Sequence, residues 1–124
     1  GITHALLGIE TMSELLGHPV IGASWEGFVI ENILSALSDG ASYGYYRTAA
    51  GAEIDLVIKK GNEFWAIEVK SSSAPKLTKG FHHACEDLNP TRKFVVYTGN
   101  DHYPFKHDVE VLSLRKMMEL ISAM

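Results

Sequence analysis

The sequence predicts a single α/β domain in which a mixed β-sheet carries helices on its faces. Its 124 residues are enough for one compact core. Apolar residues make up 46% and charged residues 21%, which is ordinary for a globular domain. The expected elements follow in the order helix, three strands, helix, strand, and this order favours helices packed on a mixed sheet.

Two helices are expected at the start of the chain. Thr11 to Glu14 has the spacing of a capping box, and Gly17-His18-Pro19 supplies a stop, so a short helix fits between them. A longer helix is expected from Ser24 to Leu37, because its apolar residues recur at helical spacing. Asp39-Gly40 ends this helix.

Three short β-prone segments come next, separated by glycine-bearing turns. They are Ser42 to Thr48, Ala52 to Ile58 and Glu63 to Lys70. We expect three antiparallel strands. A two-residue turn at Gly61-Asn62 would pair Asp55 with Glu68 and Glu53 with Lys70, whereas a turn at Lys60-Gly61 would shift these pairs and keep the same faces.

The second half of the chain predicts two more helices and two more strands. Apolar residues from Leu77 to Leu88 recur at helical spacing, and Asn89-Pro90 ends that helix. Lys93 to Thr98 reads as a buried strand. Val109 to Leu112 is expected as an edge strand, and Leu114 to Ala123 as a closing helix.

Charged residues stand inside the apolar runs of the second and third strands. In either register Asp55, Glu68 and Lys70 would share one face. Facing carboxylates repel unless a cation lies between them, and Mg²⁺ prefers carboxylate oxygens. A nearby lysine would orient the attacking water or neutralise charge on a phosphate, which is the layout that phosphodiester hydrolysis needs. The alternative is that this face points to water and that Glu53, Asp55, Glu68 and Lys70 form ordinary surface pairs.

Glu26 is a third acidic residue in an unexpected place. It falls in the middle of the apolar stripe of the expected helix from Ser24 to Leu37. A carboxylate there is costly unless it is paired, so we expect it to meet the Asp55, Glu68 and Lys70 face of the sheet. The alternative is that Glu26 is an acid of the first helical turn, favoured by the helix dipole.

These residues, taken in chain order, resemble the pattern of the PD-(D/E)XK nuclease superfamily. The matching residues are Glu26 on the first helix, Asp55 in GAEIDLVI, and Glu68-Val69-Lys70 in AIEVKSS. The resemblance implies a restriction-endonuclease-like three-layer core, with a mixed central sheet of four to five strands flanked by helices. Two departures are visible: Ile54 replaces the proline before Asp55, and the glutamine that RecB-type members carry after the lysine is absent.

The same resemblance implies a role for each matching residue. Asp55 and Glu68 would be ligands of Mg²⁺ or Mn²⁺, and the carbonyl of Val69 a further ligand. Lys70 would orient the water or stabilise charge, and Glu26 would be an accessory acid. The implied activity is endonuclease or exonuclease cleavage of DNA. The alternative is a nuclease-fold module that does not cut and instead binds DNA, a protein partner or a second copy of itself.

A narrower resemblance covers roughly residues 2 to 100. The runs HPVIGASWEGFVIENI, YYRTAAGAEIDLVI, AIEVK and DLNPTRKFVVYTG resemble the C-terminal domain of unknown function of a group of prokaryotic AAA-type ATPases. It implies that residues 1–124 are one nuclease-like domain from the end of a longer ATPase, with ATP bound only by the preceding part. The chain also begins without methionine, in a segment that looks helical, which favours the same interpretation.

Charge and cysteine content bear on partners and compartment. The net charge is −4, but residues 59–93 hold seven basic residues against four acidic ones, which leaves room for a modest phosphate-facing patch. The chain has one cysteine, Cys85, most often a core residue type, and this usage fits a reducing cytoplasm. Neither a signal peptide nor a membrane-spanning run is visible, so no membrane association is expected.

Overall fold

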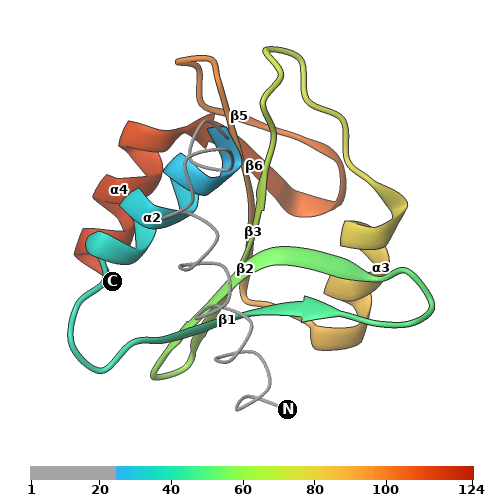
Figure 1. Ribbon diagram of the computed structural model, residues 1–124, viewed down its shortest axis with the longest axis horizontal. Helices are drawn as coiled ribbons and strands as arrows, with labels where there is room; N and C mark the ends of the chain where they lie inside the picture. The colour runs from blue at the N-terminus through green and yellow to red at the C-terminus, as the bar shows by residue number, and fades with distance from the viewer. Residues whose placement is uncertain (1–24) are drawn as a thin grey trace.

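The computed structural model describes residues 25–124, which form a six-stranded sheet between two helical layers (Figure 1). The elements are α2 (Trp25–Ser35), β1 (Ser42–Arg47), β2 (Glu53–Lys60), β3 (Glu63–Val69), α3 (Lys79–Leu88), β4 (Arg92–Tyr97), β5 (Tyr103–Pro104), η1 (Lys106–Asp108), β6 (Val109–Ser113) and α4 (Leu114–Ala123). Helices α2 and α4 pack together on one face of the sheet, and α3 covers the other. The short helix expected at residues 11–17 lies outside the described residues. None of the described helices is long and apolar enough to cross a membrane.

The sheet has the strand order β1-β2-β3-β4-β6-β5. Strands β1, β2 and β3 are antiparallel, β3 is parallel to β4, and β4 is parallel to β6. The mixed α/β class and the three antiparallel strands are therefore confirmed, but the expected count of four to five strands is wrong.

The edge of the sheet also differs from the prediction. Strand β6 lies inside the sheet, between β4 and β5. The edge on this side of the sheet is β5, the two-residue strand Tyr103–Pro104, and the opposite edge is β1. A strand of two residues is too short to show an alternating pattern, and its proline is tolerated because the strand is at an edge. This is why the sequence alone did not reveal the sixth strand.

The β2–β3 hairpin turns at Gly61-Asn62, and Lys60 is paired with Glu63 and Leu56 with Ile67. The first of the two expected registers is therefore the observed one. Gly61 has a φ of 60°, in the left-handed region that two-residue hairpin turns require and that glycine adopts without strain.

Two buried clusters fill the space between the layers. On one face, Val29 and Ile33 of α2 pack with apolar side chains of the central strands and of α4. On the other face, Phe81 and Ala84 of α3 pack over the sheet. Cys85 belongs to this second cluster, and burial raises the pKa of its thiol to about 11, as expected for a core cysteine.

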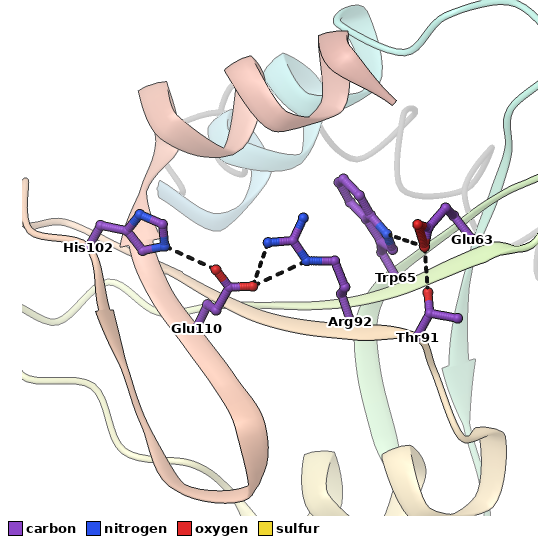
Figure 2. Close-up of polar contacts among 6 residues, drawn as sticks. All are labelled: Glu63, Trp65, Thr91, Arg92, His102 and Glu110. Carbon is purple, nitrogen blue, oxygen red and sulfur yellow. Dashed lines mark hydrogen bonds and ion pairs between the residues drawn. The ribbon is translucent and has the colours of Figure 1, made fainter.

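A polar network lies at the end of the sheet where β3 and β4 begin. Figure 2 shows Arg92 donating from Nε and Nη2 to Oε2 of Glu110, at 3.2 and 2.7 Å, while His102 lies 3.1 Å from the other oxygen. The guanidinium also lies over the rings of Phe94 and Trp65, at 4.8 and 5.2 Å. Partial burial raises the pKa of Glu110, but the hydrogen bonds from Arg92 and His102 lower it more. The network ties β4 to β6, far along β3 from the residues predicted to carry the chemistry.

Candidate functional site

Strand β2 bends away from β3 at Asp55. The regular pairing of the two strands ends at Leu56 and Ile67, and beyond it the backbone N–H of Val69 donates to Oδ2 of Asp55 at 2.9 Å. Ile54 packs in the cluster under α3 although Leu56, two residues on, packs in the opposite cluster. In a regular strand both would share one face, so the strand changes direction at Asp55.

A cavity of about 320 Å³ lies where the two strands separate. Its lining residues are Glu26, Gly51, Glu53, Asp55, Glu68, Val69, Lys70, Thr78 and Gly80. They come from the start of α2, the first residues of β2 and the turn before it, the end of β3, and the start of α3. All five predicted site residues are among them, so the structure brings the predicted set together around one cavity.

Glu68 is the most unusual side chain of the cavity. Only 5% of its surface is exposed, although it is charged in its ordinary state. It accepts a hydrogen bond from the Thr78 hydroxyl at 3.1 Å, and in its protonated form it also hydrogen-bonds Asp55. Burial and then the Asp55 carboxylate raise the pKa of Glu68 to about 8, while Lys70 and Thr78 act in the opposite direction. With its pKa raised to about 8, Glu68 favours the protonated form at neutral pH in the absence of a bound metal ion.

The backbone of Lys70 ties β3 to its neighbours on both sides. Its N–H donates to the carbonyl of Val96 on β4 at 2.9 Å, and its carbonyl accepts from Nε1 of Trp25 at 3.1 Å. The side chain of Lys70 lines the cavity. Its positive charge lowers the pKa values of Glu26 and Glu68 and so opposes burial and the charge of Asp55, which raise them.

Glu26 reaches the cavity because Trp25 anchors the start of α2 to the end of β3. It lies in the first helical turn and is exposed to solvent, as expected for an acid favoured by the helix dipole. It also lines the cavity together with Asp55, Glu68 and Lys70, as the other expectation had it. Partial burial and then the negative charge of Asp55 raise the pKa of Glu26.

Glu53 stands at the mouth of the cavity and is paired differently from the sequence expectation. It is aligned with Arg47 of β1, and their side chains form an ion pair of 3.0 Å. The expected pairing of Glu53 with Lys70 is wrong, because the pairing of β2 with β3 does not extend beyond Leu56 and Ile67. The guanidinium of Arg47 also lies 5.6 Å from the centre of the Tyr45 ring.

Three further lining residues were not predicted. Thr78 is the N-cap of α3, and its hydroxyl accepts from the N–H of Phe81 at 3.1 Å. A Cβ on Gly80 would lie 2.6 Å from the carbonyl oxygen of Gly51, so α3 approaches the turn before β2 this closely only with glycine there. Two signals were available: a threonine before a helix is an N-cap candidate, and a glycine inside a helix often marks a close approach. Because the apolar spacing starts at Leu77, both Thr78 and Gly80 fell inside the expected helix, and neither signal was used.

The oxygen atoms of the cavity fit a hard divalent cation. Asp55 and Glu68 supply two adjacent carboxylates. The N–H of Val69 faces Asp55, and because the N–H and C=O of one strand residue point to the same side, its carbonyl faces this side too. Within residues 25–124 no group of three or more His, Cys, Asp or Glu side chains is arranged to hold a metal by itself. Mg²⁺ commonly takes one or two carboxylates and completes its shell with water and substrate phosphate, so this set suits Mg²⁺ or Mn²⁺.

Comparison with known proteins gives a family but no activity. Two relatives, the uncharacterized proteins Mb2031c of Mycobacterium bovis and Rv2008c of Mycobacterium tuberculosis, are each 36% identical over 109 residues, which is 88% of this chain and 24% of theirs. The chain thus spans about a quarter of the length of these relatives. A solved structure, protein VC1899 from Vibrio cholerae, covers 79% of this chain and 31% of its own, with a TM-score of 0.43 and 15% identity. The model of a domain of unknown function, DUF4143, matches residues 21–117. The chain therefore belongs to the DUF4143 family.

Proposed function

We propose that this domain is a metal-dependent nuclease of the PD-(D/E)XK type that hydrolyses phosphodiester bonds in DNA. The observation that carries the proposal is the shared cavity, into which Glu26, Asp55, Glu68 and Lys70 converge from α2, β2 and β3. The raised pKa of Glu68 supports it, because a buried carboxyl that competes with its neighbour for one proton is typical of a site built for a cation.

Each side chain has a distinct part in the proposed reaction. Asp55 and Glu68 bind the cation, and a bound Mg²⁺ or Mn²⁺ would neutralise phosphate charge and favour the nucleophilic form of water. The ammonium group of Lys70 donates hydrogen bonds to the attacking water or to a phosphate oxygen. Glu26, at the rim, accepts the proton that the water loses. The water oxygen bonds to phosphorus, the bond from phosphorus to one sugar oxygen breaks, and that oxygen takes up a proton from solvent water.

We further infer that the domain is the C-terminal part of an AAA-type ATPase of the cytoplasm. The relatives support this, because they are about four times as long as the segment matched here and so have room for an ATPase part. In this arrangement the ATPase would bind ATP and select or remodel the DNA that the domain cuts. A second copy of the chain is a further candidate partner.

The full-length protein is expected to cut DNA when Mn²⁺ or Mg²⁺ is present and to stop when EDTA removes the metal. The measurement is the conversion of a supercoiled circular plasmid and of a linear duplex, resolved by gel electrophoresis. Nicking of the circle indicates an endonuclease, whereas degradation of the linear duplex alone indicates an exonuclease. Cleavage that persists in EDTA would contradict the metal-dependent mechanism. Tight DNA binding without cleavage under any metal condition would favour the non-cutting module instead.

A further inference from the structure

The hydroxyl of Thr78 makes two hydrogen bonds, one as acceptor and one as donor. The backbone N–H of Phe81 can only donate, so the hydroxyl oxygen accepts this bond, at 3.1 Å. The hydroxyl proton is then directed at Oε2 of Glu68, also at 3.1 Å. One side-chain oxygen thus joins the cap of α3 to the most buried carboxylate of the cavity.

The start of α3 is held firmly enough for this contact to position Glu68. Phe81 is 1% exposed and belongs to the cluster under α3. Gly80 lies against the carbonyl of Gly51, at a separation that leaves no room for a Cβ. Thr78 therefore cannot follow a movement of Glu68 without disturbing both the cap and this contact.

We propose that Thr78 is a positioning residue of the site, holding one oxygen of Glu68 so that the other is presented to the divalent cation. This inference rests on the proposed function, because the cation belongs to that proposal. Hydrogen bonds to ligating carboxylates orient them, and losing such a partner typically weakens metal binding about 10–100-fold.

A glycine substitution separates this role from helix capping. Glycine is nearly as good an N-cap as threonine, so Thr78→Gly removes the donor to Glu68 while α3 retains an acceptable start. Ser113→Gly is the matched control, because the Ser113 hydroxyl caps α4 in the same way by accepting from the N–H of Lys116 at 3.2 Å. Thr78→Ser retains both hydrogen bonds.

The full-length variants are compared by isothermal titration with Mn²⁺ and by thermal unfolding. Thr78→Gly is expected to raise the Kd for Mn²⁺ about 10–100-fold. Thr78→Ser and Ser113→Gly are expected to keep the wild-type Kd, while both glycine variants lower the melting temperature to a similar, small extent. An unchanged Kd in Thr78→Gly, or an equal loss in Ser113→Gly, would overturn the positioning role.

A crystal structure of Thr78→Gly distinguishes this inference from the proposed function. The Glu68 carboxylate is expected to leave its present place while α3 stays where it is. A carboxylate that has not moved would overturn the inference even if the wild-type protein cuts DNA. Failure of the wild-type protein to bind Mn²⁺ would contradict the proposed function, and the position of Glu68 in the variant would still decide whether Thr78 holds it.

Discussion

Asp55→Asn and Lys70→Ala are each expected to lower the rate of metal-dependent DNA cleavage by about 10²–10³-fold or more. Asparagine retains an oxygen that can accept the N–H of Val69, the bond that Asp55 makes at 2.9 Å, so the bend in β2 should survive. What it removes is the negative charge that faces Glu68 and the proposed cation. Lys70→Ala removes the ammonium group from the cavity but leaves the two backbone hydrogen bonds that tie the end of β3 to Trp25 and Val96.

These rates are measured as initial velocities of plasmid cleavage at saturating Mn²⁺, with the full-length variants. Lys76→Ala is the matched control for Lys70→Ala, because Lys76 is an exposed lysine six positions along that does not line the cavity. It is expected to cut at nearly the wild-type rate. Cleavage that survives in both Asp55→Asn and Lys70→Ala would show that the chemistry takes place elsewhere in the protein.

Glu68→Gln is expected to stabilise the domain at neutral pH, although the same change should impair cleavage. In the folded domain the pKa of Glu68 is raised to about 8, whereas the ordinary pKa of a glutamic acid, which the unfolded chain has, is 4.5. Between these values the folded state binds more protons than the unfolded state, so stability falls as the pH rises. Glutamine cannot ionise and avoids this loss. Since one pKa unit corresponds to 1.36 kcal/mol, the gain at pH 7 is on the order of 3 kcal/mol.

The sign of this effect is tested by urea unfolding in metal-free buffer at several pH values. The difference in unfolding free energy between Glu68→Gln and wild type should be near zero at pH 4, where residue 68 is neutral in both proteins. It should grow as the pH rises to about 8. Glu53→Gln is the control, because Glu53 lines the same cavity but is exposed and paired with Arg47. A Glu68→Gln variant that is destabilised at pH 7, or a difference that does not vary with pH, would contradict the account of the buried carboxyl pair.

Much of the site could be predicted because its residues obey local rules. The alternation of side chains in a strand predicts which residues share a face, and the Gly61-Asn62 turn fixes a register that pairs Leu56 with Ile67 and so brings Asp55 near Glu68. Glu26 was a candidate because a carboxylate interrupted an apolar stripe. These arguments depend only on residues that are neighbours in the sequence or across one hairpin, so the sequence alone could predict them.

The remaining features depend on contacts between distant segments. At the bend, the Asp55 carboxylate accepts the N–H of Val69 and the pairing of β2 with β1 shifts register, and no local sequence pattern indicates a side chain that replaces a backbone acceptor. The role of Thr78 depends on where α3 docks, which is set by Gly80 against Gly51. Such features could be seen only once the elements were assembled.

A crystal structure of the protein in Mn²⁺, with the ion located by its anomalous scattering, would show whether Asp55 and Glu68 form a metal site. We expect one ion bound by the carboxylates of both Asp55 and Glu68, with the carbonyl of Val69 as a further ligand and water completing the shell. Glu68 would then have released its proton and exchanged its hydrogen bond with Asp55 for the ion. A cavity that at saturating Mn²⁺ contains no ion, with Glu68 still hydrogen-bonded to Asp55, would contradict the claim that these carboxylates form a metal site.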